Sequence, residues 1–176
     1  MNIILLQKLD KLDFDRNALV DKVLQVNQDY IYLHSKPNKW SVVQIIEHLR
    51  IAEKQTLKGI KHSLETRTSF KFATFRSDLA LWITILAFKI GIKFKAPKFV
   101  ADIKEHPDLE HLISDWQQTR TEIRKIIENL PIEMVNKIIF KHPVIGLMSM
   151  RHVLDFQAAH FQVHRKQVLA ILNNSK

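Results

Sequence analysis

Hydrophobic positions along the chain recur in steps of three and four residues, which is the periodicity of amphipathic α-helices. The first such face predicts a helix over 5–33, with Arg16 as its only polar interruption. Its apolar positions are Leu5, Leu9, Leu12, Leu19, Val23, Val26, Tyr30 and Leu33. A break at Asp13–Asp15 is an alternative, because either aspartate can cap a new helix. Pro37 ends the helix, since the residue before a proline avoids the helical region.

Two further long helices are indicated by their start and stop residues. Ser41 and Gln44 have the spacing of a capping box, which predicts a second helix from Ser41 to about Glu65. Pro107–Asp108 is a typical helix start, and Pro131 closes the apolar repeat that follows it. We therefore expect a third main helix between these prolines.

The last helix and an inserted segment complete the pattern. The last helix begins at Ser149 after a loop over 142–146, and no segment shows the period-two alternation of a strand. The most apolar stretch, Leu79–Phe94, is too short to span a membrane and contains Lys89 and Lys93. A short helix packed against the others is one interpretation of it, and an interfacial membrane helix is the other.

The composition is typical of the all-α class. Three glycines and five prolines in 176 residues favour long helices over a turn-rich β fold. We expect one domain over 1–176, a four-helix bundle with a short extra helix inserted between the second and third main helices. There is no cysteine, which excludes disulfides and protein thiol nucleophiles. The N-terminal apolar run is too short for a signal peptide, so we expect a cytoplasmic protein.

The formal net charge of +9 raises the question of a polyanionic partner. The basic residues are spread over every segment, without an arginine-rich arm or a basic stripe alternating with aromatics. We interpret the charge as a solvated basic surface, with a surface for nucleic acid or anionic lipid as the alternative. The prediction is no specific nucleic-acid binding and no stable membrane insertion.

Three of the nine histidines are candidate metal ligands. His160 and His164 lie four residues apart on the apolar stripe of the last helix, although nine histidines placed at random would give roughly half of one such pair. Imidazoles on an apolar face need partners, and either one metal ion or hydrogen bonds to neighbouring side chains would supply them. His48 lies on the apolar face of the second helix, and bundles build metal sites from facing helices.

The other polar candidates give no catalytic residue. Four histidines are predicted to lie on the surface: His34, His62, His106 and His111. His142 either orients its loop or lines a pocket, and His152 is predicted to lie off the inward stripe of the last helix. Glu47 is predicted to point away from His48 and Glu53 to lie off the inward face, so no general base is assigned.

Two segments resemble the signatures of the DinB-like superfamily. NKWSVVQIIEHL (38–49) is similar to its Trp-Ser…His-Leu motif. Residues 142–168 resemble its second signature, in which a His-Pro…Gly element leads into a helix bearing His-x-x-x-His followed by Gln. FKAPKFV (94–100) is similar to a segment of some members. The resemblance covers nearly the whole chain in order and spacing.

The resemblance implies a metal protein that uses a small thiol. It implies a four-helix bundle in which His48, His160 and His164 hold a divalent metal ion, with zinc and nickel as the usual metals. Characterised relatives include bacillithiol transferases and a mycothiol-dependent maleylpyruvate isomerase, in which the metal activates a low-molecular-weight thiol. The implied function is a metal-dependent transferase, whose substrates would be such a thiol and an electrophile. The alternative is a non-catalytic, metal-containing stress or ligand-binding module, because a fold does not fix a function.

Two further expectations concern partners. Since the chain has no cysteine, the thiol would have to arrive as a cosubstrate. Lys93, Lys95 and Lys98 in the inserted segment are candidates to meet an acidic thiol. We also expect that the chain can form a homodimer.

Overall fold

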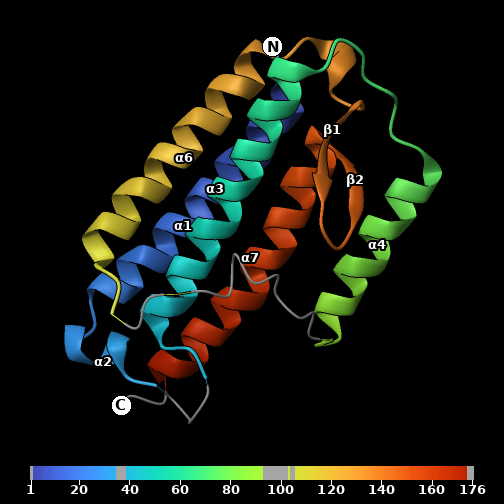
Figure 1. Cartoon of the computed structure of the whole chain (residues 1–176). Coiled ribbons are helices and arrows are strands. Elements are labelled where there is room, and N and C mark those ends of the chain that lie inside the picture. The colour runs from blue at the N-terminus through green and yellow to red at the C-terminus, as the bar shows by residue number, and fades with distance from the viewer. Residues whose placement is uncertain (1, 35–38, 93–102, 104–105, 174–176) are drawn as a thin grey trace.

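Four long helices form a bundle, as the sequence predicted (Figure 1). The computed structural model describes residues 2–34, 39–92, 103 and 106–173. The bundle helices are α1 (Ile3–Leu24), α3 (Val42–Thr66), α6 (Leu109–Asn129) and α7 (Met150–Asn173). Each places an apolar face toward the others, and such packing is the main source of stability for amphipathic helices in proteins.

The direction of the helices explains the inserted segment. Arg50 of α3 is paired with Asp115 of α6, and Lys61 is paired with Glu122 further along both helices, so α3 and α6 run parallel. Parallel neighbours need a long crossover connection rather than a short turn. The helix α4 (Phe75–Lys89) lies on this crossover, outside the bundle (Figure 1).

The first predicted helix is broken, but not at Asp13–Asp15. The helix α1 ends at Leu24 and a second short helix, α2, covers Gln28–Tyr32. Asn27 caps α2, because its side chain accepts a hydrogen bond from the backbone N–H of Asp29 at 3.0 Å. The apolar repeat continues past the end of α1, so the predicted helix was too long. Leu33, the last position assigned to the inward face, is 57% exposed.

The predicted starts of the other bundle helices are confirmed by their caps. Ser41 and Gln44 form a reciprocal capping box at the start of α3. Asp108 accepts a hydrogen bond from the backbone N–H of His111 at 3.0 Å at the start of α6. Ser149 caps α7 in the same way. These local interactions satisfy backbone groups that a helix end leaves unpaired.

The predicted loop before α7 is a β-hairpin, so the expectation of no strands was wrong. Strand β1 (Ile138–His142) pairs antiparallel with β2 (Gly146–Ser149), after a 3₁₀ turn, η1, at Ile132–Met134. Gly146 provides the positive φ of +89° in the turn. The strands are short and the register shifts between Ile138 and Phe140, so the sequence carries no sustained alternation.

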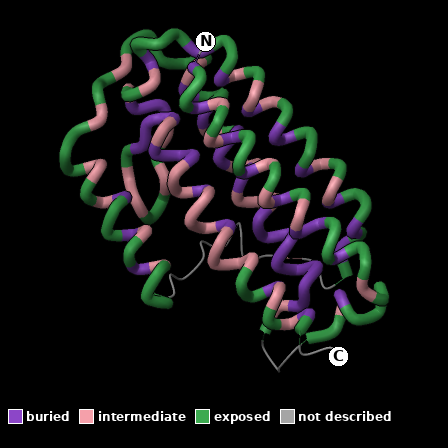
Figure 2. Tube along the Cα trace, turned by 180° about the vertical axis from the view of Figure 1, so that it is seen from behind, coloured by how far each residue is buried: buried purple, intermediate pink, exposed green. Residues whose placement is uncertain are grey.

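The inserted apolar segment is the expected short helix, packed against the bundle on one side. The helix α4 lies along α7 and buries Leu81, Thr84 and Ala87. It begins four residues before the predicted Leu79, and Lys93 lies outside the described residues. Figure 2 shows exposed positions along the other side of α4. Within the described chain, no helix is both long and apolar enough to cross a membrane.

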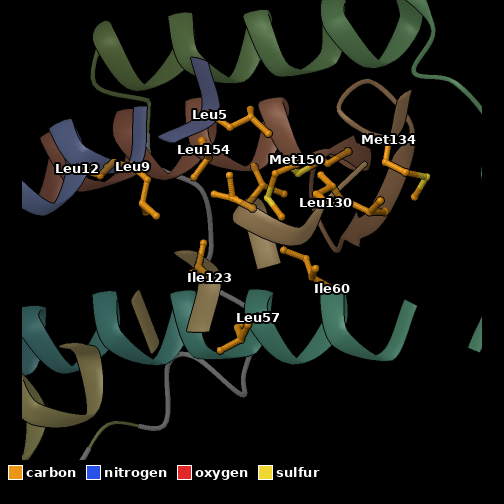
Figure 3. Packing of buried hydrophobic residues seen from close by; sticks show 14 of the residues in the cluster. Leu5, Leu9, Leu12, Leu57, Ile60, Ile123, Leu130, Met134, Met150 and Leu154 are labelled. Carbon is orange, nitrogen blue, oxygen red and sulfur yellow. The ribbon is translucent and has the colours of Figure 1, made fainter. Parts of the chain in front are cut away.

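The core consists of two apolar clusters stacked along the bundle axis. The first cluster joins α1, α3, α6 and α7 to the hairpin, and Figure 3 shows Leu9, Leu57, Ile123 and Leu154 pointing toward one another. The second cluster lies toward α2 and has Trp116 of α6 among its buried residues. Each bundle helix contributes to both clusters.

A buried polar layer separates the two clusters, and every bundle helix contributes to it. The buried polar residues at positions between the two clusters are Arg16, Glu53, Thr56, Thr119, Arg120 and Gln157. Arg120 binds both carboxylate oxygens of Glu53, one at 2.6 Å, and donates a further hydrogen bond to Asp13 at 3.1 Å. Burial alone would lower the pKa of Arg120, but the charges of Glu53 and Asp13 outweigh it and raise that pKa.

The burial of Glu53 corrects the prediction that it lies off the inward face. Its side chain is 4% exposed, and that of Arg120 is fully buried. A buried bidentate pair is specific in geometry, because each carboxylate oxygen faces its own N–H group. The helix α3 is covered on more than one side, since all residues over 42–49 are buried and Glu53 follows one turn later. A single inward stripe therefore underestimated its buried face.

We expect Glu53→Ala to destabilise the protein by about 3 kcal/mol, because it leaves Arg120 buried with half of its charge partners. Urea unfolding followed by circular dichroism measures this. Glu122→Ala is the matched control: it removes the α6 partner of an exposed α3–α6 ion pair, 30% exposed at the carboxylate, and should cost less than about 1 kcal/mol. Equal losses in the two variants would contradict a special role for the polar layer.

Candidate metal centre

The three histidines singled out in the sequence meet at one point between α3 and α7. His48 comes from α3, and His160 and His164 come from successive turns of α7. The Nε2 atom of His160 lies 3.2 Å from Nε2 of His48 and 3.1 Å from Nε2 of His164. One ligand atom from each ring can be chosen so that all three lie within 4.8 Å of one another. The structure thus brings together residues 112 positions apart.

The spacing of these nitrogens fits the ligand shell of one ion. Nitrogen ligands 2.0–2.1 Å from a tetrahedral zinc ion lie about 3.3 Å from one another. The two Nε2 distances are close to this value. Hydrogen bonds between the rings need similar distances, so the protonation of each ring decides between the two arrangements.

A glutamine on α7 fixes the protonation of His164. Nδ1 of His164 lies 2.9 Å from Oε1 of Gln167, and an amide oxygen only accepts hydrogen bonds, so Nδ1 carries the proton. In the neutral ring Nε2 then bears a lone pair, and this atom faces His160. Donation from the second ring nitrogen to an oxygen is the usual way in which proteins orient a histidine ligand.

Burial keeps two of the rings neutral. The pKa of His160 lies well below its usual value of 6.5, first because the ring is desolvated and second because His164 and His48 are nearby. The pKa of His164 is lowered to about 4, again mainly by burial and then by His48. A histidine must be deprotonated to bind a metal ion, so both rings are in the ligand form at neutral pH.

Aromatic side chains surround the histidines. The ring of Trp40 lies 4.9 Å from that of His48, measured between centroids. Phe156 stacks on His160 at 5.6 Å with an angle of 6° between the planes, and Phe88 of α4 lies 6.0 Å from His160. These apolar rings reduce access of water to the imidazoles, which strengthens any electrostatic interaction there.

The carboxylates that flank His48 in sequence do not join the histidine cluster. Glu47 is buried, with Oε1 3.8 Å from Nη2 of Arg50. Glu53 is bound by Arg120 in the polar layer. Among the described residues, the group able to hold a metal ion consists of three histidines without a carboxylate. No general base is therefore placed beside the cluster by the described chain.

Five of the other six histidines behave as the sequence suggested, and His152 does not. The four predicted surface histidines are exposed: His34, His62, His106 and His111. His142 orients its hairpin turn, because its Nδ1 accepts the backbone N–H groups of Val144 at 3.2 Å and Ile145 at 3.3 Å. Burial lowers the pKa of His142 to about 4.

His152 was predicted to lie off the inward stripe, yet it is fully buried. Its Nδ1 accepts a hydrogen bond from the backbone N–H of Ser149 at 3.4 Å. Its Nε2 lies 2.7 Å from Oδ1 of Asp78, which ties α7 to α4. This contact comes from α4, and the apolar periodicity of α7 alone carries no information on it.

The sequence did not predict the residues that surround the three histidines. Gln167 and Phe156 lie three and four residues from His164 and His160, a spacing that places side chains together on a helix and could have identified them. Phe88 had no such signal, because it reaches the site from the crossover. Lys93, Lys95 and Lys98, and the segment 94–100, lie outside the described residues.

Comparisons with known proteins agree with this fold. The sequence profile of the DinB superfamily matches residues 11–168, which include all three clustered histidines. A crystal structure described as that of TT2238, a four-helix bundle protein, is similar with a TM-score of 0.58 and 15% identity, over 97% of this chain and 99% of that chain. At this identity the likeness concerns the fold alone. No curated protein matches the sequence.

The low histidine pKa values predict that chelator-treated protein loses stability in acid. Because the folded-state pKa of His160 and His164 lies below 6.5, their neutral form contributes fully above pH 6.5, and this contribution is lost as the pH falls toward about 4. Urea midpoints measured across this window should fall less steeply for His164→Asn than for the parent.

His62→Asn is the matched control, since His62 is exposed on α3 and lies outside the cluster. It should keep the parent's dependence on pH. An unchanged slope in His164→Asn would contradict a partly desolvated, neutral ring at this position.

Proposed function

The chain belongs to the DinB superfamily, and from this premise we propose that it binds one divalent metal ion through His48, His160 and His164. The observation that carries the proposal is the convergence of three Nε2 atoms, with neighbouring spacings of 3.1 and 3.2 Å, between two rigid helices. Neutral imidazoles are borderline ligands that suit zinc and nickel. The three imidazoles therefore form a donor set that fits such an ion.

We further propose that the protein is a transferase that uses a low-molecular-weight thiol. Three protein ligands leave a position for a further molecule, as in catalytic rather than structural zinc sites. A divalent ion there would lower the pKa of a thiol or water that occupies this position. The reaction would form a bond between sulfur and an electrophilic carbon; the thiol proton would pass to solvent and the leaving group would depart with its bonding electrons.

The chain's own residues would position and shield the reactants. Gln167 holds the ring of His164 in one tautomer, and Trp40, Phe88 and Phe156 wall the site with apolar surface. Such walls favour an uncharged electrophile and limit competing hydrolysis by water. Since no described carboxylate joins the cluster, acidification of the thiol, rather than a protein base, would supply the nucleophile.

Metal content tests the ligands directly. Untagged protein should contain about one divalent ion per chain by elemental analysis, and His160→Ala or His164→Ala should contain none. Gln167→Ala should fold normally and bind the metal roughly 10- to 100-fold more weakly, because the ring of His164 loses its orientation. Gln162→Ala is the matched control, since Gln162 lies on the same helix but bonds to Asp15. Normal metal content in both histidine variants would overturn the assignment.

A panel of thiols and electrophiles tests the reaction. We expect metal-loaded protein to consume thiol and electrophile in equal amounts. Turnover should be lost in His160→Ala. In the parent protein it should be lost on chelation and return when metal is added back. Loss of free thiol and appearance of the conjugate by mass spectrometry measure it. Bound metal without turnover on any pair would contradict the transferase while leaving the metal site intact.

The second candidate is a non-catalytic, metal-containing stress or ligand-binding module. It is favoured by one observation: the outer side of α4 is apolar and exposed, with Trp82 63% and Phe75 78% accessible. A contact surface of this kind needs no chemistry at the histidines. Metal-loaded protein without turnover would favour this candidate.

A further inference from the structure

The side of α4 that faces away from the bundle is almost entirely apolar. Six apolar residues recur along this side at intervals of three or four residues, apart from one adjacent pair. Each is between 42% and 78% exposed. They form what we call the outer arc: Phe75, Leu79, Trp82, Ile83, Leu86 and Ile90. A contiguous apolar face on a surface helix marks a binding surface rather than a structural requirement.

The two exposed charged residues of α4 are both basic. Arg76 and Lys89 are exposed residues of the same helix. Asp78, the acidic residue of α4, is instead bonded to Arg151 and His152 of α7, each at 2.7 Å. Its carboxylate is thereby neutralised by the bundle, so the free face of the helix carries apolar and basic groups.

The neighbouring cleft adds to the positive charge. A cleft of about 460 Å³ runs between α1, α4 and α7. Its charged lining residues are two aspartates, Asp15 and Asp155, and four lysines: Lys8, Lys11, Lys89 and Lys166. Lys8 is paired with Asp155 and Lys11 with Asp15, so Lys89 and Lys166 account for the net positive charge of the cleft.

We propose that α4 docks the protein onto an anionic lipid bilayer. An interfacial helix places tryptophan, phenylalanine and aliphatic residues at the boundary between headgroups and acyl chains, while lysine and arginine meet lipid phosphates. The outer arc with Arg76 and Lys89 has this composition. Such docking is peripheral: the helix has 15 residues and is not long enough to cross a membrane.

Charge favours a bilayer over a second copy of the chain. A two-fold contact through the outer arc would bring Arg76 and Lys89 of one molecule against the same residues of another, in a protein of net charge +9. An anionic surface has the complementary sign. This docking is independent of metal or thiol chemistry at the histidines.

Vesicle flotation with the full-length protein tests the proposal. The protein should float with vesicles of phosphatidylcholine and phosphatidylglycerol and bind much less to phosphatidylcholine alone. Ile83→Asp should weaken binding about tenfold or more, since it places a charge in the outer arc. Lys89→Gln should weaken it about fivefold, the effect of one basic residue near an anionic surface. Emission from Trp82 should shift to shorter wavelength on binding.

Ile132→Asp is the matched control, because Ile132 is 72% exposed but lies in η1, away from α4. It should bind the anionic vesicles as the parent does. If Ile83→Asp and Ile132→Asp weaken vesicle binding equally, the effect comes from the overall charge of the protein, and the proposal is overturned. Absence of vesicle binding would overturn it too. So would concentration-dependent self-association that Ile83→Asp abolishes, which would identify a second copy as the occupant.

Discussion

The buried pair of Glu53 and Arg120 is the interaction on which the arrangement of the bundle depends. Apolar clusters alone tolerate sliding of one helix along another, because leucine and isoleucine side chains are interchangeable partners. A bidentate ion pair is not: displacing α3 against α6 by one turn would leave two buried charges unpaired. Since His48 lies five residues before Glu53 on the same helix, the pair also fixes the height of His48 in the bundle.

The polar layer has a second consequence on α7. Gln157 lies in this layer with neither side-chain polar atom hydrogen-bonded, and three residues later His160 begins the histidine cluster. Both α3 and α7 therefore carry their clustered histidines on the same side of the layer, next to the apolar cluster that contains Trp116 and Phe161. The site is supported by packed aromatic and aliphatic side chains rather than by loops, which limits the freedom of the rings.

The sequence predicted what local interactions determine. Three helix starts were predicted from caps formed within three residues, at Ser41, Asp108 and Ser149. The shared face of the three histidines followed from helical periodicity. The errors share a different origin. The buried Glu53 has its charge partner Arg120 67 positions away, and the buried His152 has its partner Asp78 74 positions away. The hairpin and the break before Asn27 were not predicted. In both places the apolar residues do not interrupt the helical periodicity of the neighbouring segments clearly enough to mark a new element.

The crossover helix separates two sets of constraints within one chain. Substitutions in the bundle must preserve core packing, the polar layer and the histidines at once, whereas those on the outside of α4 disturb no buried contact. With the docking role proposed for α4, changes on the outer side of this helix alone would give the protein a different docking surface, while the histidine cluster would be inherited unchanged. Phe88 is the exception, because it lies on the same helix and reaches His160. Through the Phe88 side chain, divergence of α4 remains coupled to the surroundings of the histidine cluster.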